Sequence, residues 1–212
     1  MMRNWLKFAL YLVVAIGVSS ARAGAYEDFF QAVIRDDVGS LRALLAQGVD
    51  PNSRDPKGYP ALTLSVQRES PRAFAALIEH PDIDVNALNA AGESALMLAA
   101  IAGDLEKCQR LLARGALVQQ QGWSPIHYAA SGPGTRIVEL LLERGATVDA
   151  EAPNGTTPLM LAAQHAPEAT VNLLLRRGAD TRRRTQRGLQ AIDFAELGGR
   201  DWLVERFEKL PR

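Results

Sequence analysis

The chain has 212 residues, of which 47% are hydrophobic and 23% are charged, and its 24 basic residues balance its 24 acidic residues. This composition is that of an ordinary globular domain, and it excludes an intrinsically disordered chain and a membrane protein with many spans. The balanced charge gives no reason to expect nucleic-acid binding, and the single cysteine, Cys108, excludes an intramolecular disulfide and a multi-cysteine metal site.

The first 23 residues have the pattern of a secretory signal peptide. Two basic residues precede an apolar run over residues 8–18, and small residues then lead to a cleavage site after Ala23, or alternatively after Ala25. The run is about half as long as the apolar helix that a bilayer requires. We therefore expect export, most consistent with the periplasm of a Gram-negative bacterium, and no stable membrane insertion after signal removal. An uncleaved N-terminal anchor is the alternative.

Five segments of the remaining chain repeat one pattern, in which a glycine precedes a capping position and a short apolar stretch. These glycines lie 34, 30, 33 and 33 residues apart and are Gly58, Gly92, Gly122, Gly155 and Gly188. A second landmark, Leu-Leu-x-x-Gly, recurs between them at a nearly fixed offset. Registered copies with a period near 33 residues indicate a repeat architecture.

Each copy predicts two short helices joined by tight turns. The first glycine suits a turn with positive φ, and the Ser or Thr that follows it in several copies can cap a helix. Pro125 and Pro158 then occupy the first helical position, where a missing N–H costs nothing. A second helix, such as residues 105–114, has apolar residues three and four apart, and Gly115 ends it. Because each pair exposes apolar surface on both sides, its stability must come from stacking on its neighbours.

Two copies carry a signature that names a family. The segments Ser124–Ala129 and Thr157–Ala162 match T-P-L-H-x-A, and the chain resembles the ankyrin-repeat family over residues 26–210. The resemblance implies an all-α ankyrin-repeat solenoid of about six helix pairs with short β-turn finger loops, preceded by a signal-peptide helix. We expect a repeat domain over residues 26–212. It divides into a capping repeat at 26–54, repeats at 55–88, 89–118, 119–151 and 152–184, and a capping repeat at 185–210.

Three departures from the regular repeat stand out. The connection between Gly115 and Gly122 is three residues shorter than its later counterparts, which shortens one finger. The segment 80–82 replaces a capping glycine with His-Pro-Asp. Only one of the five copies keeps the histidine of the signature, His127, and the resemblance implies that this histidine is structural and bonds within the loop network.

The sequence contains no catalytic or cofactor-binding motif. The histidines His80, His127 and His165 occupy different positions of different repeats, so they lack the short spacing of a two-histidine metal site. Cys108 shares the core-facing spacing of its helix, and we expect it to fill the core rather than to react. Phosphate-loop, dinucleotide and serine-hydrolase motifs are absent. The sequence therefore predicts a protein that is not an enzyme and uses no cofactor or metal.

The resemblance implies that the chain binds another protein through a concave surface of finger tips and first helices. Tyr59 and Trp123 occupy the same repeat position, and Trp, Tyr and Arg are enriched among interface anchors. We expect Trp123, Tyr59 and Arg68 to form the centre of this surface. The matching helix positions of the five copies are Gln67 and Arg68, Ile101 and Ala102, Ser131 and Gly132, Gln164 and His165, and Leu197 and Gly198. The alternatives are that the aromatics are incidental or that Trp123 folds over the shortened finger. The predicted set is Tyr59, Lys57, Gln67, Arg68, Glu93, Trp123, Gln121, Gln164, His165 and Arg187.

A second candidate surface is rich in arginine and lies near the last finger. It could grip an acidic partner or anionic lipid, whereas the more ordinary interpretation is a solvated face balanced by nearby acids. Its residues are Arg176, Arg177, Arg182, Arg183 and Arg184, with Arg187 beside them.

We expect a monomer that binds an unidentified protein partner and no nucleic acid. Two alternatives for its role remain open. One is a periplasmic stress-protection accessory of a peroxide-detoxifying enzyme, and the other is an immunity protein that blocks a toxin.

Overall fold

The structure is a computed structural model that describes residues 24–209, and the predicted signal peptide lies outside them. The chain divides into two compact units at Ala90 and Ala91, called here unit 1 and unit 2. Unit 1 contains a helix over residues 24–34, α2 (Val38–Ala46), α3 (Ala61–Gln67) and α4 (Pro71–Glu79). Unit 2 contains α5 (Ala95–Ile101), α6 (Leu105–Ala113), α7 (Pro125–Ser131), α8 (Thr135–Glu143), α9 (Pro158–His165), α10 (Glu168–Arg176), α11 (Ala191–Leu197) and α12 (Asp201–Glu208).

The helices of the described residues form six consecutive pairs, and these residues contain no strand beyond an isolated bridge between Arg54 and Pro60. The predicted all-α ankyrin-repeat fold with about six helix pairs is therefore confirmed for this part of the chain. No helix within residues 24–209 is both long enough and apolar enough to cross a membrane.

Unit 1 is held together by a small apolar core and by bonds that reach from one repeat to the next. Phe29, Leu41 and Phe74 are at most 1% exposed, and α2 packs against α4. The carboxylate of Asp36 accepts the Ala73 backbone N–H at 2.7 Å. The side chain of Asn52 bonds to the next finger segment in two places, at the Asp82 carbonyl and the Asp84 N–H. Backbone polar groups of the loops are thus satisfied by side chains one repeat away.

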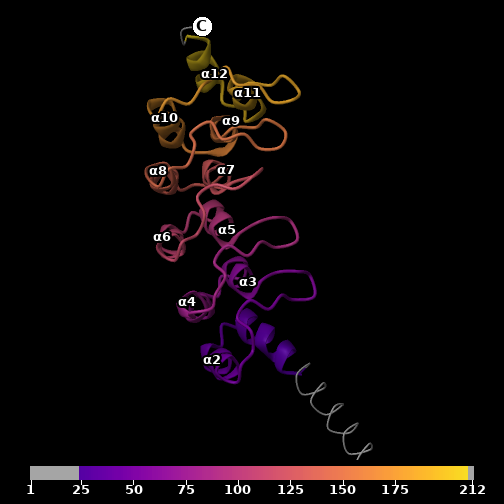
Figure 1. The fold of residues 1–212 in the computed structure, drawn as a ribbon. Helices are drawn as coiled ribbons and strands as arrows, with labels where there is room; N and C mark the ends of the chain where they lie inside the picture. Colours follow the sequence, from indigo (N-terminus) through magenta and orange to yellow (C-terminus); the bar gives the residue numbers. More distant parts are fainter. Residues whose placement is uncertain (1–23, 210–212) are drawn as a thin grey trace, which may run out of the picture. The chain divides into compact units, whose positions relative to one another are not determined.

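In unit 2 the first helices of successive pairs pack side by side. Figure 1 shows α5, α7, α9 and α11 in one row, with α6, α8 and α10 in a second row beside it. Small residues lie where successive first helices meet, and two of them, Ala129 and Ala162, are fully buried. Ile126 and Leu159 fill the space between the helices and are also fully buried. Neighbouring first helices therefore approach each other closely at these small residues.

The local signals of the sequence operate as expected at most helix ends. Ser94 and Thr157 accept the N–H groups of Met97 and Met160 and so cap α5 and α9. Gly115 ends α6 with φ at 87°, a conformation that disfavours residues with a Cβ atom. At the departure at residues 80–82, α4 ends instead on extended backbone at His80.

Substitutions at two glycines test the close packing of successive repeats, because one glycine lies at a contact between repeats and the other does not. A Cβ atom on Gly132 would lie 2.7 Å from the Ile101 carbonyl oxygen, whereas one on Gly39, inside α2, would meet only a side-chain oxygen at 3.4 Å. We expect Gly132→Ala to destabilise the protein by about 1–3 kcal/mol, because the backbone of the preceding repeat must move. Gly39→Ala should stabilise it by about 0.5 kcal/mol through helix propensity. Denaturant unfolding measures both changes, and equal effects of the two substitutions would contradict the close approach.

Candidate functional site

The predicted binding residues fall in both units. In unit 1, Lys57, Gln67 and Arg68 are exposed, and Tyr59 is half-buried. Lys57 and Tyr59 sit in a turn that is held by Asp55, whose carboxylate accepts both of their backbone N–H groups. The role of these four side chains in binding a partner stays a prediction.

Unit 2 contains a pocket of about 230 Å³ on the row of first helices. Three of its lining residues come from α7, so it is called here the α7 pocket. Its lining is mostly apolar, and its residues are Ile101, Trp123, His127, Tyr128, Ser131 and Leu161.

The repeat explains why this pocket exists. Ile101 and Ser131 occupy the same position at the ends of α5 and α7, and Tyr128 and Leu161 occupy the same position one turn earlier on α7 and α9. The large side chains of Ile101, Tyr128 and Leu161 therefore surround the small side chain of Ser131, which leaves the space of the pocket open. Its hydroxyl donates to the His127 carbonyl of its own helix, which keeps it out of the pocket volume.

Trp123 stands at the finger side of the α7 pocket and is 38% exposed. Its ring meets the His127 ring edge to face, with 5.3 Å between the centroids and 76° between the planes. The indole therefore packs against the first helix of its own repeat, and a large part of its surface stays accessible. Both sequence interpretations of Trp123 stay predictions.

His127 is buried and fixes the base of the pocket. Its Nδ1 accepts the Ser124 backbone N–H at 3.1 Å, while its Nε2 lies 3.0 Å from the Ala150 carbonyl oxygen and 3.2 Å from that of Thr156. Two carbonyls around Nε2 require a donor, so the proton resides there and Nδ1 is the acceptor. Burial holds the pKa of His127 below its usual value, and the two carbonyl contacts only partly oppose this. The structural role implied by the family resemblance matches this network.

An acidic group lies at the rim of the pocket. The Tyr128 hydroxyl donates to the Glu93 carboxylate at 3.0 Å, and this bond links α7 to the turn before α5. Burial, together with the bond to Glu93 and its negative charge, raises the pKa of Tyr128 to about 12. Tyr128 is therefore a neutral hydrogen-bond donor at physiological pH.

The structure brings only some of the predicted residues together. Trp123 and Glu93 meet around the α7 pocket, the first in its lining and the second through Tyr128. Gln121 is exposed on the same finger segment as Trp123 but outside the lining, Arg187 is exposed on the last finger, and Gln164 and His165 end α9 outside the lining. Sequence reasoning missed Tyr128 and Leu161, although their shared repeat position was a signal that could have found them.

Cys108 fills the core of unit 2, as the helical spacing predicts. It is fully buried, and burial raises the pKa of its thiol to about 12, with a further contribution from the charge of Asp104. A thiol in this state is neither accessible nor ionised at neutral pH. Within residues 24–209 no group of three or more His, Cys, Asp or Glu side chains could hold a metal ion.

Three arginines of the arginine-rich surface are paired with acidic groups. Each of the three pairs below joins an arginine to a carboxylate, and two of them reach back one repeat. They are Arg177 with Glu139 at 3.4 Å, Arg183 with Glu151 at 2.8 Å and Arg182 with Asp180 at 3.1 Å. Arg184 donates to the Gly188 carbonyl at 2.9 Å. This geometry favours the interpretation as a solvated, balanced face, and a grip on an acidic partner by Arg176 and its neighbours stays a prediction.

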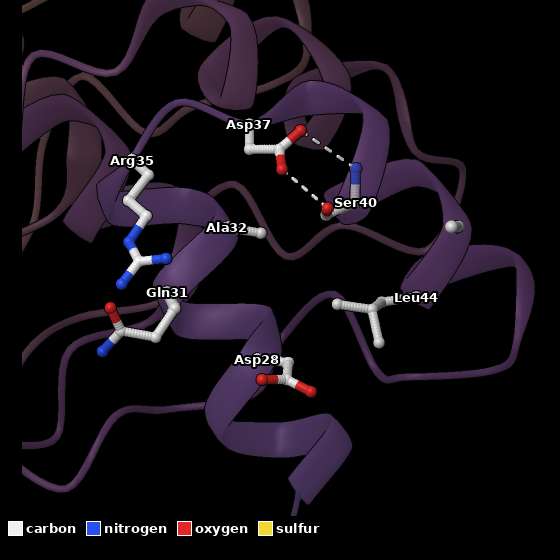
Figure 2. Close-up of a pocket in the computed structure, with 8 residues that line it drawn as sticks. Asp28, Gln31, Ala32, Arg35, Asp37, Ser40 and Leu44 are labelled. Atoms are coloured by element: carbon white, nitrogen blue, oxygen red, sulfur yellow. Dashed lines mark hydrogen bonds between the residues drawn. The ribbon is translucent and has the colours of Figure 1, made fainter.

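A second pocket, of about 300 Å³, lies in unit 1 between the helix at residues 24–34 and α2. Figure 2 shows the Asp37 carboxylate turned toward Ser40, to which it is bonded through the backbone N–H at 3.1 Å and the hydroxyl at 2.6 Å. These bonds lower the pKa of Asp37 and cap α2. The charged groups here therefore serve the helix end, and no predicted site residue lines this pocket.

The comparisons with known proteins agree with the repeat geometry. The family model described as Ankyrin repeats (3 copies) matches residues 29–121 and 96–185. The chain belongs to the ankyrin-repeat family. It is 31% identical over 157 residues to the B-cell lymphoma 3 protein homolog of Mus musculus, and this match covers 71% of this chain and 35% of that relative. It is 29% identical over 159 residues to the human transient receptor potential cation channel subfamily A member 1, covering 70% of this chain and 14% of the channel.

Two solved structures resemble the fold of this ankyrin-repeat chain. One is the ankyrin repeat domain of Bcl-3, with a TM-score of 0.66, 29% identity, and coverage of 79% of this chain and 76% of that one. The other is a chain from the complex of a predatory endopeptidase of Bdellovibrio bacteriovorus with an immunity protein, with a TM-score of 0.75 and 20% identity. That match covers 87% of this chain and 98% of the other. The chain spans about a third or less of the length of the curated relatives named above.

The His127 network predicts a pH-dependent stability that one substitution should remove. Met97 and Met160 occupy the same repeat position and accept the capping N–H through sulfur, so His127→Met is a substitution that the fold already uses. At pH 7.5 we expect it to cost about 1–2 kcal/mol, because the two carbonyls lose their donor. The folded-state pKa of His127 is depressed, so its contribution is complete above the unfolded value near 6.5 and is lost as the pH falls. The difference between the two proteins should therefore shrink as the pH falls from 7.5 to 5.

Denaturant unfolding of both proteins across this pH range measures the effect. A stability difference that stays constant from pH 7.5 to 5 would show that His127 is not held neutral by its surroundings.

Proposed function

We propose that this protein is a non-catalytic binding module that holds a partner protein on its fingers and first helices. The observation that carries the proposal is the α7 pocket, where an apolar lining opens to solvent beside a partly exposed Trp123. Accessible aromatic side chains over an apolar hollow are typical anchors of protein interfaces. The pocket lining offers no nucleophile activated by a base and no metal-binding group, since the one histidine is committed to backbone bonds.

We further propose that the protein acts after export, in the periplasm of a Gram-negative bacterium, as a monomer. The support is the pattern of the first 23 residues, with its basic start, apolar run and small residues before Ala23. Removing that segment takes away three basic residues and no acidic ones, which leaves a net charge of −3. A slightly acidic surface is consistent with a protein partner and gives no support to nucleic-acid binding.

Residues 24–209 include two partly exposed tryptophans, which make a matched test. We expect Trp123→Ala to weaken capture of the partner at least about tenfold, because the substitution removes an interface anchor. Its cost in stability should stay near 1 kcal/mol, since the ring is 38% exposed and has one aromatic contact. Trp202, on α12, is 43% exposed and lies beneath the Arg200 guanidinium, so Trp202→Ala is the control and should leave capture unchanged.

The measurement is affinity capture from periplasmic extract with the three proteins at equal concentration, followed by quantification of the bound partner. Capture that survives in Trp123→Ala, or that is lost equally in Trp202→Ala, would contradict the proposal that the partner is held at the α7 pocket.

A second, narrower candidate is that the partner is an exported peptidase which this protein holds inactive. It is favoured by the likeness to a chain from the endopeptidase–immunity protein complex, which extends over 98% of that chain and most of this one. Under this candidate we expect the purified captured enzyme to lose its hydrolytic activity at one equivalent of the protein, and Trp123→Ala to restore it. The rate of hydrolysis against added protein gives the stoichiometry. An enzyme that stays fully active in the complex would exclude inhibition and leave the binding role intact.

A redox role in support of a peroxide-detoxifying enzyme gains no support from the side chains. Such a role would require a reactive thiol, whereas Cys108 is fully buried and its pKa is raised to about 12. The protein could assist such an enzyme only by binding it.

A further inference from the structure

The α7 pocket is small for a free organic ligand and suited to a single side chain. Its volume is about 230 Å³, below the range of about 300–1,000 Å³ that is usual for small-molecule and cofactor sites. It is open to solvent beside Trp123 and Ile101, which are 38% and 43% exposed. A side chain carried on a partner surface could enter from this open side, while its backbone would remain over the fingers.

The chemistry of the lining selects an apolar occupant. The walls are the side chains of Ile101, Leu161 and Trp123 with the ring of Tyr128. The Ser131 hydroxyl already donates to the His127 carbonyl, and the His127 ring nitrogens are already bonded to backbone groups. A polar side chain entering the pocket would find few partners and would lose its bonds to water, which costs free energy.

The charge at the rim selects the neighbour of that apolar side chain. The Glu93 carboxylate lies within hydrogen-bonding distance of the Tyr128 hydroxyl, and none of the lining residues carries a competing positive charge. Because the pKa of His127 is lowered by burial, its ring stays neutral at physiological pH. A basic group at this rim would be attracted by Glu93, and an acidic one would be repelled.

We propose that the α7 pocket takes one bulky apolar side chain of a partner protein, and that a lysine or arginine close to it in the partner pairs with Glu93. This inference rests on the proposed protein-binding function and specifies the partner's chemistry. The apolar contact supplies most of the affinity, and the basic neighbour supplies selectivity, as is usual for a partly exposed charge at the edge of an interface.

The probe is a phage-displayed library of random 12-residue peptides, selected on the purified protein. We expect the enriched peptides to share Leu, Met, Phe or Trp with a basic residue within four positions. One enriched peptide is then synthesised together with a second version in which the basic residue is glutamine. Both peptides are titrated against the protein and three variants by calorimetry.

The variants separate the two parts of the proposal. Ser131→Phe fills the pocket from a half-exposed helix end and should weaken binding at least about thirtyfold. Glu93→Gln keeps an acceptor for Tyr128 but removes the charge, so it should weaken the basic peptide about fivefold and leave the glutamine peptide unaffected. Glu143→Phe places the same aromatic on an exposed position of α8 and should change nothing. Thermal unfolding of all three variants checks that they fold.

Several results would overturn the inference. These are an absence of enriched peptides, enrichment without a basic residue, equal binding by Ser131→Phe, or an equal loss for both peptides in Glu93→Gln. Self-association that Ser131→Phe abolishes would also overturn it, by assigning the pocket to a second copy of the chain. The capture experiment with Trp123→Ala is independent of these peptides. If Trp123→Ala no longer captures the partner but Ser131→Phe and Glu93→Gln capture it normally, this inference alone is overturned. If Trp123→Ala also captures the partner normally, the proposed function is overturned as well.

Discussion

The contact between successive first helices is the constraint from which the other features of unit 2 follow. Ala129 and Ala162 are fully buried where α7 and α9 meet, and a Cβ atom on Gly132 would come within 2.7 Å of the preceding repeat. Backbones this close leave no room for a side chain to adjust, so the register of one repeat fixes that of the next. Each helix pair is too small to bury its own apolar faces, and the stacking of neighbours is what makes the fold stable.

Hydrogen bonds between repeats also fix the positions of the loops, which carry the candidate site. His127 connects its own helix start to the carbonyls of Ala150 and Thr156 in the following finger. Arg200 does the same for α9, by donating to the carbonyls of Ala162 and Ala163. Loops are usually the mobile part of a domain. Here, buried donors and acceptors fix them, so a pocket beside them has a defined shape before any partner arrives, which reduces the entropy lost on binding.

The fold could be predicted from the sequence because its signals are local and repeated. A turn glycine, a capping residue and an apolar helix recur at a known period, and Pro158 begins α9 as its position predicts. The α7 pocket could not be predicted in the same way. Leu161 and Tyr128 look like ordinary core residues of the signature, and their half-exposure depends on the size of Ser131 on a neighbouring helix position. The pairing of Glu93 with Tyr128 joins residues 35 apart. The arginine pairs Arg177–Glu139 and Arg183–Glu151 also join side chains about one repeat apart, and a search for opposite charges at that separation would have found them.

The residues that stabilise the stacked repeats differ from the residues that line the α7 pocket. Stacking depends on residues that are buried in every repeat, such as Ile126 and Leu159. The pocket depends on the last residue of each first helix and on the residue after the turn glycine, where Ser131 and Trp123 face solvent at least in part. Substitutions at these pocket positions alter what the surface recognises without removing core contacts, so specificity can change while stability is kept.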